Sequence, residues 1–253
     1  MSALLPPLPV TAMLLTLGAV LVLFERRCSA WQRKESPGWW LRALFVNALQ
    51  AVVTVIGVVS WDVWLAGEGV LNPLGGWAGV LAGTALVSFV DYWWHRARHS
   101  VPLLWRVLHR FHHSPQRLEV LTAFYRHPLE MFCNGLVHSS LLYFVLGLSP
   151  LASSLVLVLL GAAELFAHSN LRSPRLLGVL LPRPEMHRLH HARGLHHYNF
   201  SQLPLWDLLF GTFRNPQHDV PLCGFPEEER VGALLLGRRV EEVRLARRYT
   251  QDS

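Results

Sequence analysis

Histidines gather in three short stretches of this sequence, at spacings that let their side chains act together. His95 and His99 are four residues apart, so on a helix both imidazoles lie on one face. The pattern H-x-x-H-H occurs twice, at residues 109–113 and again at 187–191, and its spacings also favour one helix face. Because neutral imidazole is the commonest metal ligand in proteins, the three stretches predict a metal site.

The number of histidines indicates how many ions such a site would hold. The three stretches contain His95, His99, His109, His112, His113, His187, His190 and His191. One tetrahedral zinc ion takes four ligands, so eight imidazoles predict two ions rather than one. Imidazole suits iron, zinc and copper alike, which leaves the metal open. Ferritin-like di-iron sites are excluded because they use repeated Glu-x-x-His pairs, which this sequence lacks.

Other polar residues flank the histidine stretches. Asp91 lies one turn before His95 on the same helix face, where we expect it to accept the second ring N–H of His95 and fix its tautomer. Glu164 and His168 are four residues apart, so they share a face at the end of an apolar run. These residues extend the predicted site beyond the three stretches.

The remaining histidines and the cysteines fit such a site less well. His127, next to Pro128, would either orient a ligand or only pack. His138 lies within an apolar run and is expected to be a core residue, while His218 is expected at the surface. The three cysteines are odd in number and far apart, which indicates neither a disulfide framework nor a cysteine-based metal site.

Long apolar runs surround the histidines and must hold them in place. The uncharged runs are 1–24, 43–61, 69–90 and 131–163. Each is long enough to cross the roughly 30 Å hydrocarbon core of a bilayer as a helix. Prolines and glycines place the first helix from Val10 onward and the third from near Trp77. Gly147 and Pro150 break the last run, which predicts either a helical hairpin or one span and a re-entrant segment.

The composition also favours a membrane protein. Only 16% of the residues are charged, against about 25% in soluble domains, and the mean hydropathy is +0.27. The first apolar run is followed, not preceded, by basic residues, which indicates an uncleaved spanning helix rather than a signal peptide. The net charge of +6 would suit nucleic acid, but no nucleic-acid-binding motif is present, so we expect no nucleic-acid partner.

The distribution of basic residues predicts an orientation in the membrane. Residues 25–34 are rich in Arg and Lys and should be cytoplasmic, whereas residues 62–76 contain neither and should face the other side. Counting spans from there returns residues 95–130 and 168–253 to the cytoplasmic side. All the clustered histidines lie in these two segments, so the predicted metal site is at the cytoplasmic face of a multi-pass protein.

The order of the histidine stretches, together with their flanks, resembles the fatty acid hydroxylase superfamily, also called the sterol desaturase family. The flanks are Arg126 to Glu130, Glu164 to Asn170, Tyr198 to Phe200 and Trp206 to Thr212, and the resemblance covers about residues 85–216. It implies a helical membrane protein with a cytosolic cap that holds two iron ions. It also implies O2-dependent hydroxylation or desaturation of lipids, sterols or related apolar substrates.

The resemblance carries ligand roles onto individual residues. It implies as metal ligands His95, His99, His109, His112, His113, His168, His187, His190 and His191. His196 or His197 stands where the family often has a further histidine. Further candidates for ligation, or for orienting a ligand, are His127, Asp91 and Glu164. Asn199 aligns with the family's Asn-Tyr-Gly, but Phe200 and Ser201 follow it here.

The predicted fold is all-α. We expect an integral membrane helical bundle of about four spans, with a possible re-entrant segment and a cytosolic histidine-rich helical cap. Residues 1–94 would form N-terminal transmembrane helices, and residues 95–218 the histidine-box catalytic region, including the 131–163 membrane hairpin. Residues 219–253 would form a charged cytoplasmic C-terminal tail.

Electrons for O2 chemistry would have to come from a partner, because no cytochrome b5-like, flavin or ferredoxin stretch is recognisable in the sequence. We expect an external cytochrome b5-, ferredoxin- or rubredoxin-like donor. The Arg-rich cytoplasmic surface would suit an acidic redox protein and would equally suit anionic lipid headgroups.

Several functions stay open at this point. C–H hydroxylation of a lipid leads, and a desaturase on the same site is close behind. A zinc-dependent membrane hydrolase would need a carboxylate base, for which Glu164 or Glu185 could serve, although no H-E-x-x-H motif exists. A non-catalytic metal- or haem-binding membrane protein is the remaining class, and the substrate of an oxidase is undecided among acyl chains, sterols, ether lipids and isoprenoids.

Overall fold

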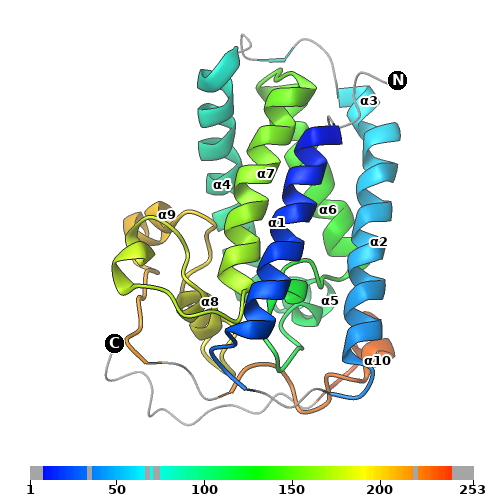
Figure 1. The fold of residues 1–253 in the computed structure, drawn as a ribbon. Coiled ribbons are helices and arrows are strands. Elements are labelled where there is room, and N and C mark those ends of the chain that lie inside the picture. Colours follow the sequence, from blue (N-terminus) through cyan, green and yellow to red (C-terminus); the bar gives the residue numbers. More distant parts are fainter. Residues whose placement is uncertain (1–7, 33–35, 66–68, 71–74, 219–221, 241–253) are drawn as a thin grey trace.

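Five helices of 12 or more residues lie roughly alongside one another in the described part of the chain (Figure 1). The structure is a computed structural model that describes residues 8–32, 36–65, 69–70, 75–218 and 222–240. The long helices are α1 (Leu8–Arg27), α2 (Trp39–Val59), α4 (Gly76–Ser100), α6 (Pro128–Ser139) and α7 (Pro150–His168). The short helices are α3 (Trp61–Leu65), α5 (Pro102–Val107), α8 (Pro184–His190), α9 (Pro204–Leu209) and α10 (Val231–Leu235). Between them lie the 3₁₀ turns η1 (His109–Phe111), η2 (Val120–Thr122) and η4 (Arg175–Val179) and the π-helical η3 (Ser140–Val145).

Proline begins α5, α6, α7, α8 and α9. Its fixed φ suits the first helical position, where its missing N–H would have had no partner within the helix. At α7 the preceding Ser149 also caps the helix, since its side chain accepts a hydrogen bond from the Ala152 N–H at 3.2 Å. The expected starts near Val10 and Trp77 agree with α1 and α4 to within two residues.

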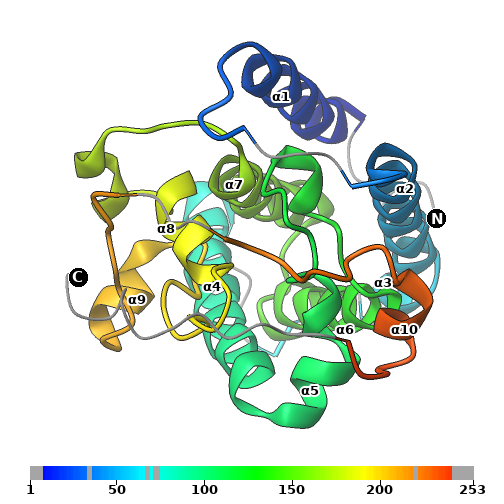
Figure 2. The same cartoon turned by 90° about the horizontal axis from the view of Figure 1, so that it is seen from below.

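Helix α7 occupies the middle of the bundle, with α1 on one side and α4 on another (Figure 2). A buried apolar cluster joins α4 to η3 and α7, and it includes Val87, Leu142, Val156 and Leu160. Helix α2 packs mainly against α6. The packing along the length of α4 and α7 therefore fixes the positions of their C-terminal ends relative to each other.

Residues 131–163 form a helical hairpin, the first of the two predicted alternatives. Helix α6 continues into η3, the chain turns at Gly147 with φ 60°, and α7 starts at Pro150. The Val70 N–H donates to the Phe144 carbonyl at 2.9 Å, which ties this turn to the segment that leads into α4. The positive φ explains why glycine stands at the turn.

Two helical stretches, Trp39–Leu65 and Pro150–His168, are long and apolar enough to cross a membrane. Length and composition would also fit the core helix of a soluble protein, but such a helix is mostly buried. Only 22% of the most apolar window of the first stretch is buried, and 44% of that of the second. Contiguous exposed apolar surface of this kind fits contact with lipid. The four predicted spans and the cytosolic cap stay predictions.

The short helices α5, α8 and α10 lie towards one end of the bundle (Figure 1). There the buried carboxylate of Glu25, at the end of α1, accepts N–H groups of Val120 at 3.1 Å and Asn170 at 2.9 Å. Trp39, at the start of α2, donates to Glu119 at 2.5 Å. Described parts of the three segments predicted to be cytoplasmic thus meet at a single end, which is the end that carries the clustered histidines.

The all-α prediction is confirmed for the described residues, which contain no strand and one isolated antiparallel bridge, between Ala192 and Cys223. The division into three domains stays a prediction. Residues 222–240 of the expected tail pack on the rest of the molecule, because Phe225 and Leu234 join a buried cluster with Trp39. Arg33, Lys34, Glu68 and residues 219–221 and 241–253, which entered the charge and tail predictions, lie outside the described residues.

Candidate metal centre

Helices α4 and α7 both deliver histidines at their C-terminal ends. His95 and His99 lie one turn apart near the end of α4, and His168 is the last residue of α7. Because the two helices pack along their length and end together, their last turns face the same space. The helical spacing predicted for the first stretch is therefore present.

The two H-x-x-H-H stretches differ in backbone structure. Residues 187–191 belong to α8, with His191 as its C-terminal cap. Residues 109–113 begin with the single 3₁₀ turn η1, and His112 ends that turn. Both stretches are buried, and α8 packs against α7.

Five histidines form what we call the first group, namely His95, His99, His109, His113 and His190. One ring nitrogen from each lies within 4.8 Å of the corresponding nitrogens of the others. The Nε2 atom of His95 is 2.9 Å from Nε2 of His109 and 3.3 Å from Nε2 of His99. The first group thus draws on α4, η1 with its flank, and α8.

Four histidines form the second group, namely His112, His168, His187 and His191. Their ligand nitrogens also lie within 4.8 Å of one another, and all four residues are buried. The Nε2 atom of His168 is 3.2 Å from that of His112 and 3.0 Å from that of His187. The Nε2 atoms of His187 and His191 are 3.1 Å apart.

The two groups adjoin each other. The rings of His113 and His191, one from each group, stack with centroids 4.1 Å apart and planes at 15°. Together the groups contain all nine histidines that the family resemblance implies as ligands. Residues 109–113 and 187–191 therefore face a shared space, although more than 70 residues separate them.

The second nitrogen of several rings determines which nitrogen is available to a metal. Nδ1 of His95 lies 2.6 Å from the Phe200 carbonyl oxygen. Nδ1 of His190 lies 2.8 Å from the Tyr198 carbonyl oxygen, and the same pattern holds for His112 and His168 with other carbonyls. A carbonyl oxygen can only accept, so each Nδ1 must carry the proton. The Nε2 lone pair of each neutral ring is then free to bind a metal.

An unusual backbone conformation positions the carbonyl that orients His95. Asn199 has φ 56°, the one positive φ of a non-glycine residue in the described chain. Asparagine tolerates this left-handed conformation better than most residues, and here its side chain donates to the Met186 carbonyl at 3.0 Å. Phe200 and Ser201 depart from the family's Asn-Tyr-Gly, but Asn199 still holds the turn. The Asp207 carboxylate accepts hydrogen bonds from the N–H groups of Phe200 and Ser201.

The short nitrogen–nitrogen distances suit a cation between the rings. Burial, followed by the neighbouring His168, holds the pKa of His112 well below its ordinary value, so the His112 ring is neutral near pH 7. Two neutral rings that face each other through Nε2 lone pairs repel unless a positive ion lies between them. Ligands about 2.1 Å from one first-row metal ion lie roughly 3.0–3.4 Å apart at octahedral or tetrahedral angles. The observed 3.0–3.2 Å in the second group fits that requirement.

Several ring nitrogens in the cluster lack hydrogen-bond partners among the described residues. They are Nδ1 of His99, both nitrogens of His113, Nε2 of His190 and Nδ1 of His191, and all are buried. Burial, followed by the neighbouring His191, holds the pKa of His113 well below its ordinary value, so protonation would not satisfy these atoms. Buried polar atoms without a partner are costly, and metal coordination would remove that cost for Nε2 of His190 and for one nitrogen of His113. The donor set therefore fits two metal ions.

Glu130 and Arg98 support the first group, and sequence reasoning gave them no role. The Glu130 carboxylate accepts from Nδ1 of His109 at 3.0 Å and pairs with the Arg98 guanidinium. The side chain of Glu130 is completely buried, so the arginine supplies the balancing charge. Two signals were available: Arg98 lies between two predicted ligands, and Glu130 closes one of the flanking pieces of the resemblance.

The expectation that Asp91 orients His95 is wrong. Both Asp91 oxygens contact Nε2 of His138, at 2.9 and 3.0 Å, and one of them accepts from the Gln202 amide at 3.2 Å. The proton of His95 already has a carbonyl partner, so no carboxylate is needed there. His138 is accordingly not a plain core residue but half of a buried polar pair.

The other candidates are distributed around the cluster. His127 caps α6 by accepting the Leu129 N–H and donating to the Leu235 carbonyl, so it is directed away from the cluster. His196 lies beside the first group, with its ring centroid 4.9 Å from that of His113, and burial lowers its pKa to about 4. His197 and His218 are exposed.

Glu164 lies beside the second group but does not join it. Its backbone carbonyl accepts from Nδ1 of His168 at 2.9 Å, while its side chain pairs with the Arg126 guanidinium. Its nearest carboxylate oxygen is 3.9 Å from the same His168 nitrogen. Glu164 therefore orients a proposed ligand through its main chain.

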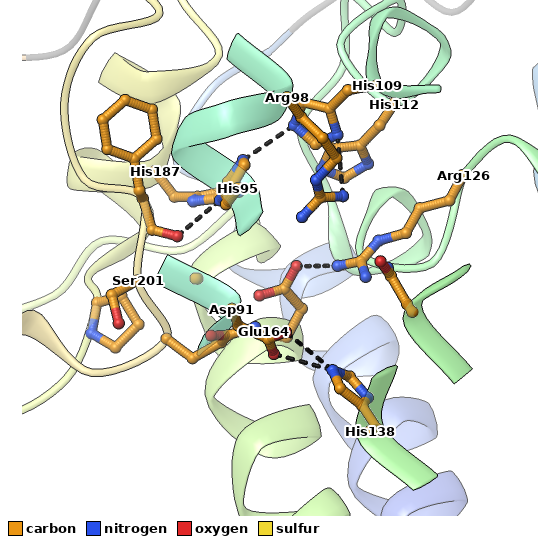
Figure 3. Close-up of a pocket in the computed structure, with 15 residues that line it drawn as sticks. Asp91, His95, Arg98, His109, His112, Arg126, His138, Glu164, His187 and Ser201 are labelled. Carbon is orange, nitrogen blue, oxygen red and sulfur yellow. Dashed lines mark hydrogen bonds and ion pairs between the residues drawn. The ribbon is translucent and has the colours of Figure 1, made fainter. Parts of the chain in front are cut away.

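A small cavity borders the histidines on the side of α6 and α7 (Figure 3). His95, His109, His112 and His187 line one part of it. Most of the remaining lining is polar, namely Asp91, Arg98, Arg126, Asn134, His138, Glu164, Ser201 and Gln202, and three residues are apolar, namely Ala167, Pro182 and Phe200. Figure 3 shows the Arg126–Glu164 and Asp91–His138 pairs next to the labelled histidines.

The chain is similar to one known protein family and to several known proteins. The sequence model of the fatty acid hydroxylase family matches residues 80–212. Alkylglycerol monooxygenase of Homo sapiens is 29% identical over 131 residues, which cover 50% of this chain and 28% of that protein. The sphingolipid C4-hydroxylase of Schizosaccharomyces pombe is 28% identical over 140 residues, covering 54% of this chain and 48% of that protein.

A desaturase is also among the relatives. The Delta(7)-sterol 5(6)-desaturase of Aspergillus fumigatus is 26% identical over 163 residues, which cover 63% of this chain and 45% of that protein. This chain spans less than half the length of each of these relatives. No solved structure matches it. The region that the family model matches contains all nine clustered histidines.

Proposed function

Because the chain belongs to the fatty acid hydroxylase family, we propose that it is a di-iron oxidoreductase that hydroxylates a C–H bond of a lipid with O2. The observation that carries the proposal is the pair of adjoining histidine groups, with five and four ligand nitrogens. A pair of groups suits two ions better than one, because a single tetrahedral ion takes four ligands.

The choice of iron rests on the type of reaction. The relatives are named as a monooxygenase, a hydroxylase and a desaturase, and all three names describe oxidations. Zinc has no redox chemistry, whereas iron combines redox chemistry with an affinity for imidazole. Two iron ions held by the histidines would supply the activation of O2 that oxidation of a C–H bond requires.

The protein's own contribution is to hold the metal ions, to orient the histidine rings and to limit the access of water. We assign metal ligation to His95, His99, His109, His112, His113, His168, His187, His190 and His191. Main-chain carbonyls keep the Nδ1 protons of four of these rings in place, so the Nε2 lone pairs point inward without rearrangement. Seven of the nine histidines are buried, which limits the access of bulk water and the loss of the oxidant to side reactions.

Desaturation at the same site is the second candidate, and the sterol desaturase relative supports it. Both reactions begin with removal of a hydrogen atom from the substrate, so the same ligands would serve either one. Mass spectrometry of the product separates them, because hydroxylation adds one oxygen atom and desaturation removes two hydrogen atoms.

The proposal also concerns the membrane topology of the protein and the source of its electrons. We propose a multi-pass membrane protein with the histidine end on the cytoplasmic side and a lipid substrate that enters from the bilayer. Support comes from the exposed apolar helices and from the meeting of the predicted cytoplasmic segments at one end. We also propose an external electron donor of the cytochrome b5, ferredoxin or rubredoxin type, which the net charge of +6 would attract if that donor is acidic.

An untargeted comparison of lipids tests the function. The native chain, His112→Ala and His218→Ala are expressed in the same host, and total lipids are analysed by mass spectrometry. We expect an oxidised lipid in cells with the native chain and with His218→Ala, whose replaced histidine is exposed and outside both groups. His112→Ala should lack that lipid, because the second group loses one of its four nitrogens.

Metal and oxygen dependence complete the test. The purified native protein should contain about two iron atoms per chain, as two ligand groups require. Product formation that continues without O2, or a His112→Ala variant with unchanged product and iron content, would contradict the proposal.

A further inference from the structure

The polar part of the cavity beside the histidines has features that metal binding leaves unexplained. We call it the polar chamber and define it by Asp91, Arg126, Asn134, His138, Glu164 and Gln202. These residues come from α4, α6, α7, the segment before α6 and the loop before α9. A pocket that takes only hydrocarbon would be lined mainly by apolar side chains, and this one is not.

Burying the residues of the polar chamber within an apolar helical bundle costs free energy. Its two carboxylates, Asp91 and Glu164, have side chains only 8% and 13% exposed, and each is paired, with His138 and Arg126 respectively. Asn134 accepts from the Trp94 ring N–H at 2.8 Å, which holds its amide in place. Burying charged groups costs several kcal/mol per ion even when they are paired, so simple packing does not account for this set.

Two buried atoms of chamber residues lack hydrogen-bond partners in the described chain. Nε of Arg126 is a donor and Oε1 of Gln202 is an acceptor. Gln202 is held in position by its other amide atom, which donates to Asp91 at 3.2 Å. Both residues line the cavity, and between them they have one unused donor and one unused acceptor. A hydroxyl group matches this pair in kind, because it donates once and accepts twice.

The size and charge of the cavity favour a hydroxyl group as the bound group. The space open to the centre of a water-sized sphere is about 20 Å³. That volume, which is the whole cavity, holds about one water molecule, so only a group as small as a hydroxyl enters it, with its carbon chain outside, and a phosphate or carboxylate does not fit. The nearby carboxylates would also repel an anion, and the Glu164 carboxylate is already paired with the Arg126 guanidinium.

We propose that the polar chamber binds an alcohol group of the lipid substrate. Because the same cavity is bordered by His95, His112 and His187, a bound hydroxyl would place carbons a few bonds away against the histidine cluster. The substrate class is then a lipid alcohol that is oxidised close to its hydroxyl, rather than a plain acyl chain oxidised far from any polar group. This inference rests on the proposed oxidase function but concerns binding, which can be measured separately.

The test compares two probes that differ in one group. 1-Hexadecanol and 1-fluorohexadecane have nearly equal size, but the fluorine cannot donate a hydrogen bond. Both compete with radiolabelled hexadecanol for the full-length, metal-loaded protein in phosphatidylcholine nanodiscs. We expect hexadecanol to bind about tenfold more tightly, since a site built for a hydroxyl rejects an analogue that leaves its polar groups unpaired.

The Gln202→Leu variant tests the residue assignment, with Gln50→Leu as a matched control. Gln50 lies on α2, outside the chamber, and contacts Thr54. We expect Gln202→Leu to bind the two probes about equally and Gln50→Leu to keep the native preference. A preference that survives in Gln202→Leu overturns the assignment.

Equal or absent binding of the two probes by the native protein overturns the inference whether or not any variant folds. A clear preference for hexadecanol in a protein that forms no oxidised lipid would instead contradict the proposed function and leave the alcohol site standing. The position of the new oxygen or double bond in a product provides a second check, because it should lie within a few bonds of a hydroxyl.

Discussion

Main-chain carbonyls orient four of the nine clustered imidazoles, His95, His112, His168 and His190. Rings such as His95 and His190 donate Nδ1–H to backbone carbonyls, which no side-chain substitution can remove. His109 differs from these four rings, because its Nδ1 faces a side chain, the Glu130 carboxylate, at 3.0 Å. At the residue scale, Glu130 is therefore the orienting group most open to a test by mutation.

Replacing Glu130 by Gln should weaken metal binding. Outer partners of metal-binding histidines are typically worth 10–100-fold in affinity, so we expect a loss in that range. The variant should also unfold more easily, since Arg98 keeps its buried charge without a carboxylate, at a cost of about 3–5 kcal/mol. Chelator competition and thermal unfolding measure the two effects.

A matched control is Glu227→Gln. The Glu227–Arg230 pair is largely exposed, so its loss should change stability by no more than about 1 kcal/mol and leave metal affinity unchanged. The role of Glu130 would be refuted by a Glu130→Gln variant that binds metal as tightly as the native protein.

At the scale of elements, α7 determines where the site forms. It packs against both α1 and α4 and ends at His168. The approach of α4 depends on Gly83, where an added Cβ would lie 2.9 Å from Val156 Cγ2 and 3.0 Å from Leu148 Cδ1. The small residue lets the two helices come close enough for their last turns to share ligands.

Gly83→Val should push α4 away from α7. We expect a loss of about 1–3 kcal/mol of stability, the usual cost of overpacking, together with lower iron content although no ligand is changed. Gly232→Val is the control, because nothing lies within 4 Å of the Cβ position there. Thermal unfolding and metal analysis of both variants decide the matter, and equal effects would argue against the close α4–α7 contact.

At the scale of the whole molecule, polar and apolar surfaces are separated along the bundle. The sides of the long helices expose residues such as Leu41, Phe45 and Val55, while the histidines lie at one end. Cys28 is exposed near that end, just after α1, and Val70 is exposed near the turn at Gly147, towards the other end. These two positions should lie on opposite sides of a membrane.

A labelling experiment tests this orientation. In a chain with Cys133→Ser and Cys223→Ser, a membrane-impermeant maleimide added outside intact cells should leave Cys28 unlabelled and react after lysis. In the same background with Cys28→Ser and Val70→Cys, labelling should occur before lysis. Labelling of both positions from one side would refute the proposed topology.

Local rules determined much of the fold and of the ligand list. Proline and glycine placed the helix starts near Trp77 and Pro150, because their backbone restrictions act within a few residues. The spacing of His95 and His99 was enough to put them on one helix face. Family resemblance added His168, which spacing alone did not connect to the other stretches.

Tertiary packing decided which histidines act together. His112 and His113 are neighbours in sequence but belong to different groups, and so do His190 and His191. Successive residues on a helical turn point about 100° apart, so the two side chains of each pair point in different directions. Only the positions of α4, α7 and α8 determine which other histidines lie in each direction. The partner of Asp91 was hidden for the same reason, because the helices that bring it to His138 meet through contacts between residues distant in sequence.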